Sequence, residues 1–184
     1  DGVWTTVLVD DLLPASLART PLFAQPRGTK ALWVPLLEKA FAKLCGGYGA
    51  LEGGSTTEAL SVLTGAPTRM RALSDVAGES SELLWAELLS SRDAGFLLTA
   101  STSSAVCPAD DLRARGLVPN HAYTVLDVRM EAGLRLLRLR NPWGSARFAS
   151  GASVPAELAS ESAADTGAFW LTFDELRVLF GSVV

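Results

Sequence analysis

Hydrophobic residues recur at helical spacing in three stretches of the first half of the chain. In residues 31–44 apolar side chains fall three and four positions apart, which is the spacing of one buried helix face. Gly46-Gly47 follows directly and is typical of a helix end. The pattern predicts helices over residues 31–44, over the residues between the capping box Ser55-Thr56-Thr57-Glu58 and Gly65, and over residues 80–91, where Leu84, Trp85, Leu88 and Leu89 form the buried face.

Strand-like runs are shorter and fall mainly in the second half. Each is rich in β-branched, aromatic and aliphatic residues and is bounded by turn residues. The expected strands are residues 4–9, 96–100, 123–128, 134–139 and 169–173; a polar loop is expected over 101–117, an irregular crossing over 145–166, and a terminal helix through Phe180 after the second capping box, Thr172-x-x-Glu175. Helices precede antiparallel strands, so the predicted fold class is α+β.

The runs 123–128 and 134–139 read as one β-hairpin, with Met130-Glu131-Ala132-Gly133 as its turn. Two neighbouring registers are plausible. One pairs Asp127 with Arg135 and His121 with Asn141, and the other sets Asp127 opposite Leu136. We favour the first because it gives one opposite-charge pair and two apolar pairs on one face, and it brings His121 within hydrogen-bond reach of Asn141 as a consequence.

His121 is the single histidine of the chain, and Asn141-Pro142-Trp143-Gly144 lies twenty residues further on. In a Cys-His-Asn site the asparagine orients the imidazole, and the imidazole takes the proton of a cysteine thiol. Trp143 could shield the His-Asn hydrogen bond from water, which would strengthen it. A structural histidine beside an Asn-Pro turn explains the same residues. Spacing alone leaves these two interpretations evenly balanced.

Composition narrows the class of protein. The 184 residues are 48% hydrophobic, enough for one domain or for one half of a larger one. A net charge of −4 without a basic cluster argues against nucleic acid as a partner. No signal peptide or transmembrane segment is expected, and two cysteines suggest a reduced, cytoplasmic protein. The chain lacks a starting methionine, which suggests a segment of a longer protein.

Neither cysteine is a convincing nucleophile. Cys45 falls at the C-terminal end of a predicted helix, where the helix dipole disfavours a thiolate. Cys107 precedes Asp110-Asp111, whose carboxylates would raise the pKa of its thiol. One histidine and two separated cysteines do not support a zinc site either. The sequence therefore offers a base and an orienting residue without the nucleophile that they would serve.

Several long motifs closely resemble calpain-type cysteine proteases, and the similarity runs from end to end. The motifs are Leu32-Trp33-Val34-Pro35-Leu36-Leu37-Glu38-Lys39-Ala40 with Ala42-Lys43-Leu44, Leu51-Glu52-Gly53-Gly54-Ser55-Thr56-Thr57-Glu58-Ala59-Leu60, Gly116-Leu117-Val118, His121-Ala122-Tyr123, Leu139-Arg140-Asn141-Pro142-Trp143-Gly144, and Phe169-Trp170-Leu171-Thr172-Phe173. The opening residues 4–11 resemble the strand that follows the calpain crossover.

The resemblance implies that residues 1–184 form the second lobe of a calpain protease core, with a papain-like arrangement of barrel-like antiparallel sheets and flanking helices. His121 and Asn141 match the family's catalytic pair, and Trp143 matches its shielding tryptophan. The nucleophilic cysteine would come from a first lobe of the same protein, and proteins would be the substrates. A calpain-like binding or regulatory module without the cysteine is the alternative.

The resemblance also bears on calcium, which usually aligns the two lobes of a calpain. The segment before residues 169–173 offers Asp165 as its one carboxylate. We therefore expect no cofactor or calcium site in this lobe, with Asp165 as a weak candidate ligand, while calcium stays possible for the full-length protein. Cys45 stands where many relatives have a histidine, which supports a structural role for it.

Overall fold

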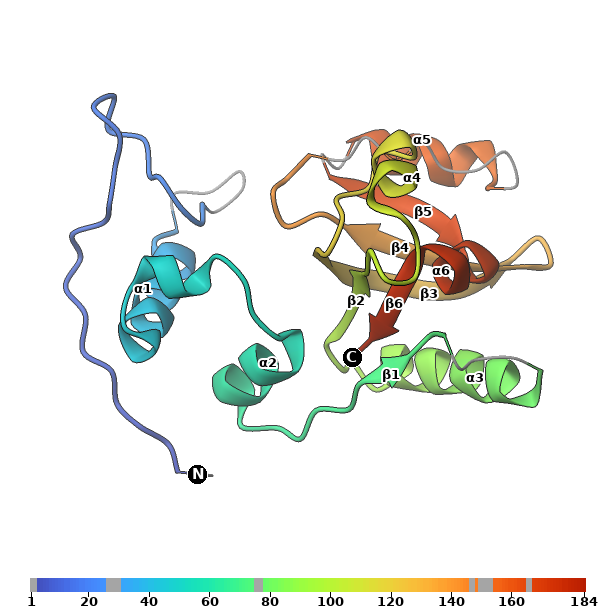
Figure 1. Cartoon of the computed structure of the whole chain (residues 1–184), viewed down its shortest axis with the longest axis horizontal. Coiled ribbons are helices and arrows are strands. Elements are labelled where there is room, and N and C mark those ends of the chain that lie inside the picture. The colour runs from blue at the N-terminus through green and yellow to red at the C-terminus, as the bar shows by residue number, and fades with distance from the viewer. Residues whose placement is uncertain (1–2, 26–30, 75–77, 146–147, 149–153, 165–166) are drawn as a thin grey trace. The chain divides into compact units, whose positions relative to one another are not determined.

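The computed structural model describes residues 3–25, 31–74, 78–145, 148, 154–164 and 167–184. The chain is divided into two compact units, Asp1–Pro67 and Thr68–Val184. The first consists of helices and extended segments, and the second is built around an antiparallel sheet with helices beside it (Figure 1). The predicted α+β class is confirmed.

The helices of Asp1–Pro67 follow the sequence signals. They are α1 (Trp33–Cys45), the short 3₁₀ helix η1 (Tyr48–Leu51) and α2 (Thr56–Thr64). Gly46 ends α1 with a left-handed φ of 95°, and Gly65 ends α2 with a φ of 68°. The Ser55 capping box is not formed, because the Ser55 side chain makes no capping hydrogen bond. The two predicted helices are confirmed, whereas the predicted capping box at Ser55 is wrong.

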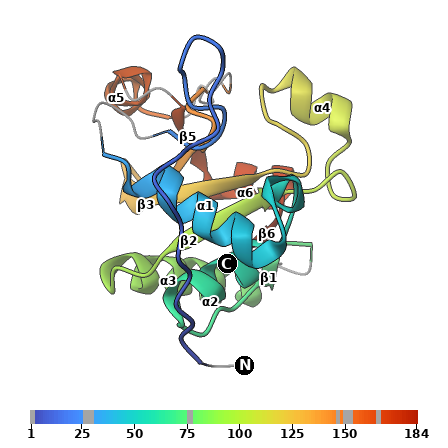
Figure 2. The ribbon, with the colours of Figure 1, turned by 90° about the vertical axis from the view of Figure 1, so that its left-hand side faces the viewer.

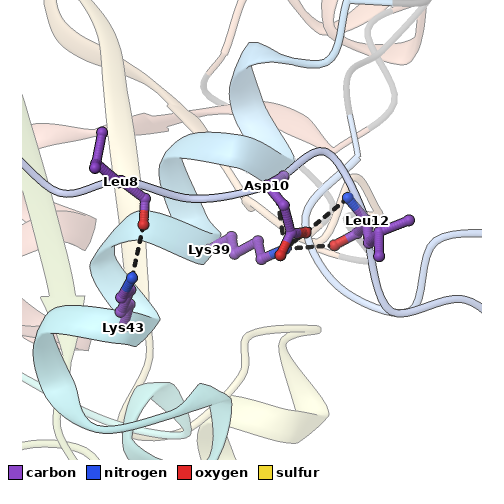
Figure 3. A network of polar contacts seen from close by, with 5 residues as sticks. All are labelled: Leu8, Asp10, Leu12, Lys39 and Lys43. Atoms are coloured by element: carbon purple, nitrogen blue, oxygen red, sulfur yellow. Dashed lines mark hydrogen bonds and ion pairs between the residues drawn. The ribbon is translucent and has the colours of Figure 1, made fainter.

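The predicted strand over residues 4–9 was also wrong. These residues are extended but pair with no strand of the described chain, and Trp4 and Leu8 are 76% and 77% exposed. The segment instead runs along α1 (Figure 2). Lysines of α1 bind its carbonyl groups: Lys39 Nζ lies 2.6 Å from the oxygen of Leu12, and Lys43 Nζ lies 2.7 Å from the oxygen of Leu8 (Figure 3). Side-chain donors thus replace the ladder that a strand would need.

The second unit holds a six-stranded antiparallel sheet. Its strands are β1 (Arg71–Ala72), β2 (Leu98–Thr102), β3 (Ala122–Glu131), β4 (Leu134–Arg140), β5 (Ala168–Thr172) and β6 (Phe180–Val183), in the order β1-β6-β2-β3-β4-β5. The sheet is open between β1 and β5, so "barrel-like" describes it only loosely. β6 was not predicted: it follows the terminal helix immediately and pairs with both β1 and β2.

Four helices accompany the sheet: α3 (Glu79–Asp93), α4 (Ala109–Ala114), α5 (Ala156–Ala164) and α6 (Phe173–Leu179). α3 and α6 confirm the predicted helices, and the predicted Thr172 capping box is complete, with the Glu175 N–H donating to Thr172 Oγ1 at 3.1 Å. α4 lies in the expected loop 101–117, and α5 lies in the expected crossing 145–166. Both helices are short, so their apolar spacing covers too few turns to stand out.

Side chains on both faces of the sheet are buried. The main core gathers Leu84, Trp85 and Leu88 of α3 with Leu176 and Leu179 of α6 and with one face of the central strands. A second, smaller core joins Leu136 of β4 and Trp170 of β5 to Val154 and to Leu158 of α5. Because both faces of β4 and β5 are covered, the position of each residue along these strands is tightly fixed.

Candidate active site

The hairpin formed by β3 and β4 has a different register from the one we favoured. Its turn is the two-residue loop Ala132-Gly133, whose φ angles of 50° and 79° are both positive. Glu131 therefore pairs with Leu134, and Asp127 pairs with Arg138 rather than with Arg135. Met130 and Glu131 belong to the strand, not to the turn. A two-residue turn with two positive φ angles matches the twist of the strands, whereas a type I or II turn would splay them.

A β-bulge at Leu126 then shifts the register by one residue. Val125 pairs with Leu139, whereas Asp127 pairs with Arg138, so Leu126 has no partner of its own on β4. The buried positions change phase across the bulge: Val128 faces the main core on one side of it, and Val125 and Tyr123 do so on the other. One extra residue in a strand has this effect, because side chains alternate between faces.

The bulge brings His121 and Asn141 to the same face of the hairpin. The last pair of the ladder, Thr124 with Arg140, sets Asn141 level with Tyr123 and diagonally opposite His121. Without the shift, Asn141 would lie level with Thr124, and His121 would fall on the opposite face of the hairpin. The favoured register was wrong in its pairing, but it also placed the two residues on one face.

His121 and Asn141 are joined by a hydrogen bond. The Nε2 atom of His121 lies 3.0 Å from Oδ1 of Asn141, and the main-chain N–H of Trp143 donates to the same oxygen at 3.1 Å. Since an amide N–H can only donate, the shared atom must be the oxygen of the side-chain amide, and His121 must donate from Nε2. This tautomer leaves a lone pair on Nδ1, the nitrogen that can accept a proton.

Asn141 is held more firmly than the histidine it orients. Asn141 is only 4% exposed. Its main-chain N–H donates to the main-chain oxygen of Gly167 at 2.8 Å, and its main-chain oxygen accepts from the Gly144 N–H at 2.9 Å. Gly167 has a φ of 98°, and a Cβ there would lie 3.1 Å from the Asn141 oxygen. The backbone around Asn141 therefore requires glycine at this position.

Two aromatic rings flank the imidazole of His121. The Trp143 ring lies 4.4 Å from it between centroids, tilted by 46°, and this indole is 67% exposed. Tyr123 meets it edge-on at 5.1 Å and is buried. Burial raises the pKa of the Tyr123 phenol, and its oxygen accepts the Val118 N–H at 2.9 Å. One side of the ring is thus anchored in the core and the other is covered by a surface indole.

A family model described as calpain family cysteine protease matches residues 1–184. The chain belongs to the calpain family. It is 35% identical over 195 residues to the calpain-type cysteine protease DEK1 of Zea mays, covering 99% of this chain and 9% of that protein. It is 32% identical over 213 residues to calpain-5 of Mus musculus, covering 100% and 33%, and 31% identical over 191 residues to calpain-7 of Sus scrofa, covering 96% and 23%. The chain thus spans a third or less of the length of these calpains.

Of the other residues considered from the sequence, the two cysteines can be placed in the structure and Asp165 cannot. Cys45 is exposed at the end of α1 in the first unit, and Cys107 is buried in the main core of the second, with both thiols free. Asp165 lies outside the described residues. Within the described part of the calpain-family chain, no group of three or more His, Cys, Asp or Glu side chains could hold a metal ion. Nor does any helix there have the length and hydrophobicity to cross a membrane.

Sequence reasoning missed three residues that support the site. Thr102 and Gly167 contact the backbone of His121 and of Asn141, and Tyr123 was predicted only as a strand residue. Thr102 fell inside a predicted loop because the strand before it was expected to end at Ala100. A glycine next to a predicted strand was a usable signal for Gly167, since an isolated glycine there often marks a close backbone approach.

Proposed function

We propose that this chain supplies the histidine and asparagine of a calpain-like cysteine endopeptidase. The observation that carries the proposal is the bond from His121 Nε2 to Asn141 Oδ1, with the Trp143 N–H on the same oxygen. Two donors on one buried oxygen define a single orientation of the imidazole. A binding module that used neither residue would have no need of this arrangement.

In the proposed reaction the nucleophilic cysteine comes from a first lobe of the same protein. Nδ1 of His121 takes the thiol proton, and the thiolate attacks the carbonyl carbon of the scissile peptide bond. The C–N bond of the tetrahedral intermediate breaks as His121 returns that proton to the leaving amine, which leaves a thioester. His121 then deprotonates a water molecule that attacks the thioester. The C–S bond breaks, His121 returns its proton to the departing thiolate, and the acid product leaves as a carboxylate and a proton released to solvent.

Asn141 and Trp143 have supporting roles in this scheme. Asn141 keeps the proton on Nε2, so that Nδ1 faces the sulfur, and it stabilises the imidazolium that forms in each half-reaction. Trp143 covers the ring and its hydrogen bond, which lowers the local dielectric and strengthens the bond. We propose protein substrates, a cytoplasmic setting in which thiols stay reduced, and calcium, where it acts, in parts of the full-length protein other than this lobe.

The experiment is peptide hydrolysis by the full-length protein and by its His121→Ala variant. We expect the variant to lose at least about 10³-fold in kcat, because no other group in the site can take the thiol proton. Thr124→Ala is the matched control: Thr124 lies in β3, three residues after His121, with an exposed side chain that faces away, so its variant should keep full activity. Undiminished cleavage by His121→Ala would refute the proposal.

A second experiment addresses the non-catalytic alternative and the missing nucleophile. A peptidyl electrophile that reacts with active-site thiols should label the first lobe of the full-length protein and leave the isolated 184-residue chain unlabelled. Specific labelling of Cys45 or Cys107 would contradict our assignment. A full-length protein without any labelled cysteine would favour a binding or regulatory module.

A further inference from the structure

We propose that Thr102 is a positioning residue for His121, and this inference rests on the proposed function. Thr102 is the last residue of β2 and is 3% exposed, one of the few buried polar side chains. The ladder between β2 and β3 pairs Ser101 with Ala122, so the next position places Thr102 directly opposite His121. The histidine therefore meets Thr102 on one side and Asn141 on the other.

The hydroxyl of Thr102 completes the last rung of this ladder. The Thr102 N–H donates to the His121 oxygen at 2.9 Å, as in any antiparallel pair. In the return direction, the His121 N–H donates to Oγ1 of Thr102 at 3.0 Å. A side-chain oxygen thus takes the place that a main-chain carbonyl usually has. β3 begins at Ala122, so this side chain lets the pairing extend to His121, one residue before the start of β3.

The same hydroxyl also fixes the turn that leads into His121. Its proton is directed to the Val118 oxygen at 2.7 Å, a shorter contact than the 3.2 Å to the His121 oxygen. The N–H of Val118 is bound from the other side by the Tyr123 oxygen. Between Val118 and His121 the chain turns through Asn120, whose φ is 50°. The Thr102 hydroxyl therefore binds both ends of this short turn, Val118 and His121, and the Tyr123 hydroxyl binds the Val118 end a second time.

The backbone of His121 needs such support because β3 begins only at Ala122. The imidazole has to reach Asn141 diagonally, across a strand pair that has already ended. A small rotation of the His121 backbone would move Nε2 away from Oδ1 of Asn141. The hydrogen bond that favours the Nε2–H tautomer would then be lost. Thr102 acts on the reaction through His121 and does not touch the reacting atoms.

The test compares three variants of similar size. Thr102→Val keeps the volume and removes the hydroxyl, whereas Thr102→Ser keeps the hydroxyl and removes a methyl group. Thr99→Val is the matched control: Thr99 lies on the same strand, and its buried hydroxyl has no hydrogen-bond partner among the described residues. If the effect comes from the hydrogen bonds, only Thr102→Val should show it.

Two measurements separate positioning from a general loss of structure. In the full-length protein, Thr102→Val should lower kcat by roughly 10- to 100-fold with little change in KM, while Thr102→Ser and Thr99→Val stay near wild type. In the 184-residue chain, whose one histidine gives unambiguous signals, ¹⁵N shifts of the imidazole should show the Nε2–H tautomer becoming mixed in Thr102→Val alone. If Thr102→Val does not fold, Tyr123→Phe removes the second hydrogen bond that holds Val118 and should shift the tautomer in the same direction.

The outcomes are distinguishable from failure of the proposed function. A full-length protein that cleaves peptides equally well with Thr102→Val, and whose imidazole signals are unchanged, overturns the positioning role and leaves the proposed function standing. Altered imidazole signals in a protein that never cleaves peptides support the positioning role and count against the proposed function. Equal losses of kcat in Thr102→Val and Thr102→Ser also overturn the positioning role, because packing would then be the cause.

Discussion

The two units of the chain are similarly rich in hydrophobic residues, yet they bury them very differently. Among the described residues of Asp1–Pro67, only Pro35 and Ala42 are buried. Thr68–Val184 has two hydrophobic cores, on the two faces of its sheet. The first unit is shaped by local signals such as glycine helix ends and lysines that bind carbonyls. The second is shaped by pairing between strands that are distant in sequence.

This difference explains where the candidate site lies. A bond such as that between His121 and Asn141 requires two strands fixed in register, and register is strongly specified where one face of each strand is buried, as it is in β3 and β4. The exposed extended segment of the first unit offers no such constraint. The contrast can be tested by making equivalent changes in the two units.

The largest effect is expected from deleting Arg138 of β4, which pairs with β3 on one side and with β5 on the other. Removal of one residue there forces either Leu139 or Leu136 and Leu137 onto the wrong face of the sheet. We expect a loss of more than about 4 kcal/mol in the free energy of unfolding, measured by urea denaturation.

Substitution at the same position is the control for the deletion. Arg138→Ala keeps the register of β4 and truncates a side chain that is partly exposed, so it should cost no more than about 2 kcal/mol. A deletion variant of ordinary stability, with the His121 and Asn141 side chains still in contact by NMR, would show that register does not control the site.

The next largest effect compares one leucine from each unit. Leu137 is fully buried in the main core, so Leu137→Ala should destabilise the chain by about 2–5 kcal/mol. Leu44 of α1 is exposed, and Leu44→Ala should change the free energy of unfolding by no more than about 0.5 kcal/mol. Both values can be read from the same denaturation series. Comparable losses in the two variants would mean that Leu44 is buried in solution, and the contrast between the units would fail.

The sequence could predict the helices better than the strands for a physical reason. Helix signals are local: the spacing in residues 31–44 and the glycines after α1 and α2 act within one segment. A strand depends on a neighbour, which explains why residues 4–9 were wrongly expected to pair and why β6 was missed. The α+β class was predictable because it rests on the order of elements, not on their partners.

The candidate site shows the same division. The residue types and their spacing singled out His121, Asn141 and Trp143, and the hydrogen-bond geometry then joined them. The strand register that brings these residues together could not be predicted, because the bulge at Leu126 has no sequence marker such as glycine. The support from Thr102 was hidden too, since it comes from a strand end nineteen residues earlier in the sequence.

A smaller effect is expected at the two helix starts that carry the same capping motif. In α6 the Thr172 side chain accepts the Glu175 N–H, so Thr172→Ala should cost about 1 kcal/mol. In α2 the Ser55 side chain makes no capping bond, and Ser55→Ala should be close to neutral. Thermal unfolding of the two variants, followed by circular dichroism, gives the comparison. A clear loss for Ser55→Ala would show that the motif does cap α2 in solution.

The smallest effect concerns one carboxylate in each unit. Arg71 binds Glu87 through two nitrogens, at 3.2 and 2.7 Å, and this bonding lowers the pKa of Glu87. The pKa of Asp10 is lowered as well, chiefly by its hydrogen bond to Lys39 (Figure 3). Because both are lower in the folded chain, each pair adds stability above the ordinary carboxyl pKa and loses it as the pH falls through the folded value.

Neutral variants measure the two contributions separately. Glu87→Gln should lower stability near neutral pH by at most about 1 kcal/mol, since the pair is well exposed to solvent. Its difference from wild type should shrink as the pH is lowered from about 6 to about 3, because the wild-type carboxylate is protonated over that range. Asp10→Asn should show the same sign with a smaller amplitude, since one ammonium group replaces a two-point guanidinium contact. A larger pH-dependent loss of unfolding free energy for Asp10→Asn than for Glu87→Gln would reverse the comparison. The Lys39–Asp10 pair would then contribute more stability than the Arg71–Glu87 pair.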